Sequence, residues 1–150
     1  RERPSVGGSN AELVVRFLHL LCEGHNLTLQ NYIRHQGGAH KSVDLVSAVA
    51  DYVISVTPFV NPFSVRVAEA AWLALAEFVQ SPCRPNQRLL VDTKLSSQAN
   101  LVLGLNPTRA ARHFFEMTGK QDEARRMPEF KSYAKNVNRL KAAVVTALLS

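Results

Sequence analysis

Two glutamates, each followed closely by a second polar side chain, are the residues of this chain best suited to bind an ion. Glu23 is followed by His25, and Glu77 is followed by Gln80. Both glutamates fall where a run of helical apolar spacing ends. The helix macrodipole leaves partial negative charge at that end, so a carboxylate is unfavourable there and a bound cation would stabilise it. Residues three apart share a helix face, which allows the amide of Gln80 to reach the same point as Glu77.

The donor atoms indicate which cation would bind. Oxygen ligands without a thiolate favour calcium or magnesium over zinc. Carbonyl oxygens at the two helix ends are expected to be free to join them, and His25 is placed to orient Glu23 as an outer-shell donor. Calcium takes about six to eight oxygens, more than two glutamates supply. The predicted site is therefore incomplete. On these residues alone, the alternative of two solvated surface carboxylates stays open.

Other combinations of reactive side chains are less convincing. Each cysteine lies beside an apolar run, which is typical of a core thiol rather than a nucleophile paired with histidine. The spacing of Cys22 and His25 is not a paired zinc-ligand motif. No acid–base set converges, so we expect a protein that is not an enzyme. The side chains of the rejected zinc set are Cys22, His25 and Cys83 with one of His19, His35 or His40.

The elements that position these residues are predicted to be helices throughout. Eight helices joined by short loops indicate an all-α domain, either an armadillo-like α-solenoid or a closed helical bundle. Trp72 is expected to anchor the core. The helices are expected from a capping box at Ser9 to about Glu23, from a cap at Asn26 to before Gly37, from Ser42 to Thr57, from Ser64 to Gln80, from Pro85 through Leu90, from Ser96 or Ser97 for a short stretch, from Pro107 to Gly119, and from Pro128 to Leu149.

Apolar spacing also predicts which faces are buried. In the first helix the buried face is expected to contain Val14, Val15, Phe17, Leu18 and Leu21. In the last helix the apolar residues recur every three or four positions, and the opposite face is basic. Its basic residues are Lys131, Lys135, Arg139 and Lys141.

Length and composition bound the class of protein. With 150 residues and 46% apolar residues, the chain suits a single domain at 1–150, with residues 1–9 as a flexible lead-in. We interpret it as a piece of a larger protein. The most apolar stretch, 43–56, is too short to span a membrane. The net charge of +6 comes with interspersed acidic residues, so a solvated helix face is favoured over a nucleic-acid surface.

Several short motifs resemble the associated homology domain of inositol trisphosphate receptors and ryanodine receptors, the tetrameric calcium-release channels of internal membranes. They are LLCEGHN at 20–26, LQNY at 29–32, the turn from Glu77 to Gln80 followed by Pro82-Cys83, and Asn86-Gln87. The resemblance implies a cytosolic α-solenoid module that links the ligand-sensing part of a homotetrameric channel to its pore. It also implies a location at the endoplasmic or sarcoplasmic reticulum, or at a related calcium store.

The resemblance further implies roles for the four polar residues. Glu23 and Glu77 would be calcium ligands, and His25 and Gln80 would be outer-shell partners. A remaining oxygen would come from the channel's C-terminal domain, which this chain does not include. The implied partners are other domains of the same channel, with no nucleic acid and with membrane contact only through the parent protein. The competing interpretation is a helical interaction scaffold without a metal site, which binds an acidic partner through its basic last helix.

Overall fold

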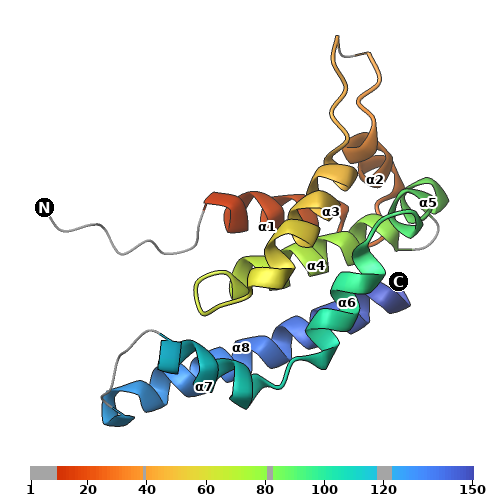
Figure 1. Cartoon of the computed structure of the whole chain (residues 1–150). Helices are drawn as coiled ribbons and strands as arrows, with labels where there is room; N and C mark the ends of the chain where they lie inside the picture. Colours follow the sequence, from red (N-terminus) through yellow and green to blue (C-terminus); the bar gives the residue numbers. More distant parts are fainter. Residues whose placement is uncertain (1–9, 39, 81–82, 118–122) are drawn as a thin grey trace, which may run out of the picture.

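The described residues of the computed structural model, 10–38, 40–80, 83–117 and 123–150, form α-helices and one short 3-10 helix, with no strand among them. Side chains at 123–127 and 129–130 are not described. The prediction of an all-α domain is confirmed for this part of the chain (Figure 1). The elements are α1 (Asn10–Cys22), α2 (Leu27–Arg34), α3 (Leu45–Val56), η1 (Thr57–Phe59), α4 (Val65–Val79), α5 (Arg84–Val91), α6 (Leu95–Gly104), α7 (Pro107–Met117) and α8 (Glu123–Leu149).

Helix α4 is the centre of the fold, because it is apolar on almost every side. It packs against α1 and α3 on one side and α8 on the other (Figure 1). Trp72 is 2% exposed and is among the largest fully buried side chains, which confirms its predicted role in the core. Its neighbours in the core include Leu75 and Phe78 of α4, Val46 and Val53 of α3, and Val137, Leu140 and Val144 of α8. Stacking of helix pairs as in an armadillo-type solenoid remains a prediction.

Side-chain caps define several helix starts. The Asn26 side chain accepts from the backbone N–H of Leu29 at 3.1 Å, as expected for α2. The predicted start of α3 at Ser42 is wrong, because the cap is Asp44. Its carboxylate accepts both the backbone N–H and the hydroxyl of Ser47, at 3.0 and 2.7 Å. A carboxylate offers two acceptor oxygens to the helix end, whereas a serine hydroxyl offers one. The predicted cap at Ser9 lies outside the described residues.

The start of α8 is also earlier than predicted. Proline was expected to begin this helix, but Pro128 lies inside it and the helix runs from Glu123 to Leu149. Proline has a φ close to the helical value, although inside a helix it removes one backbone hydrogen bond and its ring crowds the carbonyl group four residues earlier. Pro128 therefore does not mark the first turn of α8. The predicted end of α7 at Gly119 falls outside the described residues, and the described helix ends at Met117.

The buried face of α1 is narrower than predicted. Val15, Leu18 and Cys22 are buried, whereas Val14 and Phe17 are 58% and 60% exposed. Positions three and four apart form one stripe along a helix, and α4 covers only that stripe. The predicted burial of Val14 and Phe17 is therefore wrong.

Two buried carboxylates join the helices around α4. Glu12 of α1 accepts from Arg16 at 3.0 Å and from Arg66 of α4 at 3.1 Å. Glu69 of α4 pairs with Arg139 of α8 at 2.8 Å. Each arginine keeps at least half of its side chain exposed, so it reaches the carboxylate from the surface. Among the described residues, no helix is long and apolar enough to cross a membrane.

Candidate functional site

Side-chain amides cap the C-terminal end of α4, where the last carbonyl groups have no partner within the helix. The amide nitrogen of Gln30 donates to the carbonyl oxygen of Glu77 at 2.6 Å and to that of Gln80 at 3.3 Å. The amide nitrogen of Asn86 donates to the carbonyl oxygen of Phe78 at 2.8 Å. The amide of Gln87 reaches the last residue of α4, Val79, at 2.9 Å. Four consecutive carbonyls therefore accept hydrogen bonds from side chains.

Asn86 ties three helices together at this end. It is fully buried, and its amide nitrogen also donates to the carbonyl oxygen of Gln30 at 3.0 Å. Its side-chain oxygen accepts from Arg34 Nε at 2.9 Å, and Arg34 also donates to the Asn31 side chain at 2.7 Å. These bonds join α2 and α5 to the end of α4. Gln30, Asn86 and Gln87 were noticed in the sequence only as parts of motifs, and their capping role was missed.

This arrangement corrects one expectation. The carbonyl oxygens at the end of α4 were expected to be free to join a cation's ligands. In the structure they already accept from amides, because the chain supplies Gln30, Asn86 and Gln87 at the helix end. What α4 offers a cation is therefore the side chain of Glu77 rather than its backbone.

Glu77 and Gln80 lie together, as their spacing predicted. The Gln80 amide nitrogen donates to Glu77 Oε1 at 3.1 Å. The other carboxylate oxygen, Oε2, is buried and has no hydrogen-bond partner among the described residues. A buried carboxylate oxygen without a donor is costly unless it is paired. Nor does any cationic side chain in the described part of the chain form an ion pair with it.

Glu23 lies one residue beyond the end of α1, since that helix ends at Cys22. Its side chain is exposed, and Gly24 and His25 follow in left-handed conformations, with φ of 77° and 62°. Glycine adopts this conformation without strain, and histidine does so more readily than β-branched residues. The turn directs the chain from α1 into α2. No hydrogen bond joins His25 to Glu23 in the described region, so its outer-shell role stays a prediction.

The end of α1 and the carboxylate of Glu77 are close enough to interact electrostatically. Burial, together with the negative charge of Glu77 and the nearby Cys83 thiol, raises the pKa of the Cys22 thiol to about 11. Cys22 is the residue before Glu23. The structure therefore brings the Glu77 side chain near the segment that carries the second predicted ligand, while the joint binding of one ion by Glu23 and Glu77 remains a prediction.

The cysteines are part of the core. Cys22 and Cys83 are both fully buried and free, as the interpretation of core thiols expected. Within the described ranges, no group of three or more histidine, cysteine, aspartate or glutamate side chains is arranged to hold a metal ion.

The raised pKa of Cys22 predicts how stability changes in alkali. Above pH 9.0, the ordinary pKa, the unfolded chain loses this proton, whereas the folded chain keeps it to about pH 11. The free energy of unfolding should therefore fall as the pH rises through this interval. Urea unfolding under reducing conditions should show a smaller fall for Cys22→Ala than for the natural chain. Equal slopes for the two proteins would contradict the prediction.

A comparison with known protein families gives a match over the part of the chain that carries this site. The sequence model of the family described as "RyR and IP3R Homology associated" matches residues 9–103, close to two-thirds of the chain. The matched segment contains α1 to α6 almost completely, including all four predicted site residues and the amides that cap α4. The chain belongs to this family, which is found in the intracellular calcium-release channels of the ryanodine receptor and inositol trisphosphate receptor type.

Proposed function

We propose that this chain is a cytosolic, non-enzymatic regulatory module of an intracellular calcium-release channel, in which Glu23 and Glu77 bind a calcium ion that promotes opening. The observation that carries the proposal is the buried Oε2 atom of Glu77, which has no partner among the described residues. Glu77 lies within the segment that matches the family, at a helix end whose partial charge is negative. A divalent cation is the partner that this oxygen lacks.

The residues present suit calcium. The amide of Gln80 holds Oε1 of Glu77 and leaves Oε2 for the ion. Glu23 follows the end of α1 and its side chain is exposed, so it is free to turn toward an ion bound at Glu77. Both donors are carboxylate oxygens, the ligand type that calcium prefers. His25 is proposed to act on Glu23 as an outer-shell partner.

A shared ion explains why such a site would control a gate. Calcium supplies, when bound, a divalent charge that attracts oxygens from several parts of a protein. Two glutamates provide fewer than the roughly six to eight oxygens that it takes, so further ligands are proposed to come from the C-terminal domain of the same homotetrameric channel and from water. An ion held by two bodies binds their docked arrangement best and shifts the population toward it.

The alternative of a scaffold that binds an acidic partner through α8 has less support. Arg139 pairs with Glu69, and the ammonium group of Lys141 donates to the carbonyl oxygen of Leu105 at 2.9 Å. Two of the four basic residues predicted on the polar face of α8 are thus bound to groups of the domain itself. Lys131 and Lys135 remain exposed, and two solvated lysines are a small electrostatic surface.

The test of the proposed function is the calcium dependence of opening in the full-length channel. Replacing Glu23 or Glu77 by glutamine keeps the size of the side chain and removes its charge, so each variant should need more calcium to open. Unchanged calcium dependence in both variants would contradict the proposal and favour a domain without a metal site.

A further inference from the structure

The outer side of helix α1 is apolar and remains largely exposed. The helix packs mainly against α4 and lies at the margin of the helical array (Figure 1). A spacing of four and then three residues places Leu13, Phe17 and Leu20 in one stripe, and Val14 lies beside it. These four side chains, called the outer stripe below, are between 58% and 62% exposed.

The sequence of α1 is typical of a helix that is packed on two sides. Val15, Leu18 and Cys22 are buried in the core, and the outer stripe lies on the opposite side of the helix. The exposed face of a surface helix is usually polar. Single apolar side chains on a surface are common, whereas a contiguous row of them marks an interaction site. The outer stripe therefore has the pattern of a helix–helix interface.

A groove of about 240 Å³ lies beside the outer stripe, between α1, α4 and α8. Leu20 belongs to both features, because it ends the stripe and also lines the groove. A ridge of apolar side chains next to a groove is the surface that an amphipathic helix recognises. The other residues that line the groove are Arg16, His19, Glu69, Ala70, Leu73 and Arg139.

The charge beside the outer stripe is positive. On α1 itself, Arg16 is the only exposed charged side chain, since Glu12 is 5% exposed. One oxygen of Glu12 accepts from both Arg16 and Arg66, at 3.0 and 3.1 Å, so two guanidinium groups share one carboxylate. Arg139 pairs with Glu69 in the groove and adds no net charge. Both Arg16 and Arg66 keep at least half of the side chain exposed, so they can donate to further carboxylates.

We propose that the outer stripe and the groove bind an acidic amphipathic α-helix of a partner polypeptide. Its apolar side covers the outer stripe, and its flanking carboxylates pair with Arg16 and Arg66. A second copy of this chain fits less well, because it presents the same positive charge. The proposal uses neither Glu23 nor Glu77. Its failure would leave the calcium proposal standing, and failure of the calcium proposal would leave it standing.

The probe for this surface is a fluorescent synthetic helix of three heptads, with leucine at positions a and d and glutamate on both flanks. A second peptide carries lysine in place of every glutamate. Fluorescence anisotropy measures the binding of each peptide to the natural chain. The glutamate peptide should bind about tenfold or more tightly than the lysine peptide, and added salt should weaken its binding.

Two exposed leucines provide matched variants, Leu20 of the outer stripe and Leu101 of α6. Leu20→Ser should weaken binding of the glutamate peptide by about tenfold, as the loss of an apolar anchor in an interface does. Leu101→Ser is the same chemical change outside the stripe and should leave binding as it is. Phe17→Ser should act as Leu20→Ser does. Circular dichroism confirms that each variant keeps its helices.

Any of three results would overturn the proposal. The first is equal or absent binding of the two peptides to the natural chain. The second is an equal loss of binding in Leu20→Ser and Leu101→Ser, which would mean that the peptide does not use the stripe. The third is self-association of the natural chain in sedimentation that Phe17→Ser abolishes, which would make a second copy the occupant. The first result needs no variant, so it decides the matter even if a variant fails to fold.

Discussion

Glu77→Gln is expected to raise the calcium concentration for half-maximal opening of the full-length channel by about tenfold or more. The substitution keeps the volume of the side chain but removes the charge next to the orphaned Oε2 position. Even outer-shell partners of metal sites typically change metal affinity by about 10- to 100-fold when they are removed. A direct ligand should therefore cost at least as much. The measurement is channel opening, by flux or single-channel recording, against free calcium.

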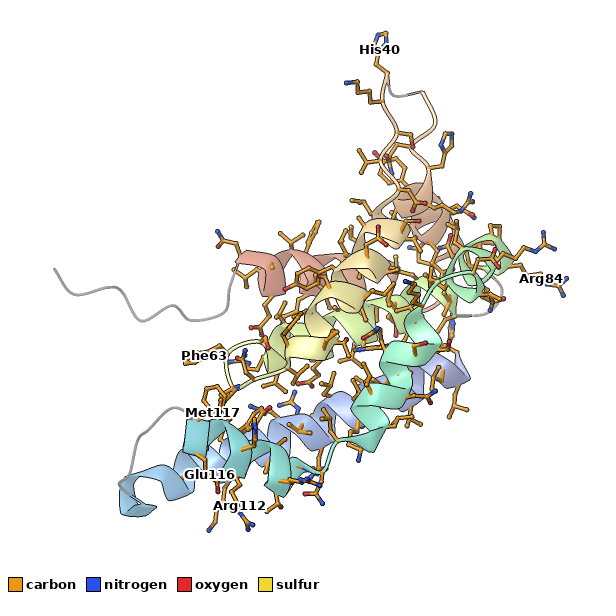
Figure 2. All side chains as sticks on the ribbon, in the orientation of Figure 1. His40, Phe63, Arg84, Arg112, Glu116 and Met117 are labelled. Carbon is orange, nitrogen blue, oxygen red and sulfur yellow. The ribbon has the colours of Figure 1, made fainter. Side chains whose placement is uncertain are left out.

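Glu116→Gln is the matched control for this variant. Glu116 is exposed on α7 and lies at the opposite end of the molecule from α5, which packs against the end of α4 (Figure 2). The same chemical change there should leave the calcium dependence as it is. An equal shift in both variants would mean that net charge, rather than a site, controls opening. A response to calcium that is unchanged in Glu77→Gln would exclude this residue as a ligand.

Asn86→Leu is expected to lower the free energy of unfolding of the domain by about 3–5 kcal/mol. Asn86 is fully buried and makes three hydrogen bonds, to the carbonyls of Gln30 and Phe78 and from Arg34. Leucine has the same branching but cannot form hydrogen bonds, so the two carbonyls and the Arg34 Nε lose these bonds, and each buried unsatisfied group costs about 1–3 kcal/mol. Urea unfolding, followed by circular dichroism, measures the loss.

The matched control is Asn100→Leu, the same change at an exposed position of α6. Its effect should stay within about 0.5 kcal/mol, as for most surface substitutions. A loss below about 1 kcal/mol for Asn86→Leu would show that the amide network contributes little to holding the end of α4. The position of Glu77 would then need another explanation.

Helical periodicity was sufficient to predict most elements of this fold. The apolar spacing of α4 is so regular that its bounds, its burial and the anchoring role of Trp72 follow from the residues alone. Local capping was harder to predict, because Ser42 and Asp44 are both good cap residues. In the structure it is the Asp44 carboxylate that accepts from the backbone N–H and the hydroxyl of Ser47. The position of a proline relative to the start of its helix was also ambiguous. Pro85 stands in the first turn of α5, whereas Pro128 lies inside α8.

Tertiary contacts explain what periodicity could not predict. Val14 and Phe17 have the spacing of a buried helix face. Whether such a position is buried depends on whether a neighbouring helix covers it, and both side chains are exposed. The ion pairs of Glu12 with Arg66 and of Glu69 with Arg139 join helices that are far apart in the sequence. No local sequence pattern predicts such pairs.

In the candidate site, too, local contacts were predictable from the sequence and tertiary contacts were not. The contact of Glu77 with Gln80 follows from a spacing of three in one helix, and it was predictable. The capping of α4 by Gln30 and Asn86 depends on the packing of three helices, so it was not. Because these amides hold the carbonyl groups at the end of α4, the helix end is fixed in place, and Glu77 extends from a rigid support.

A double-mutant cycle of Glu23→Gln and Glu77→Gln in the full-length channel tests most directly whether one ion is held by both carboxylates. The readout is the calcium concentration for half-maximal opening in the natural channel, the two single variants and the double variant. If both side chains bind the same ion, the double variant should be shifted little further than the more affected single variant. Shifts that multiply as independent effects would contradict a shared calcium site.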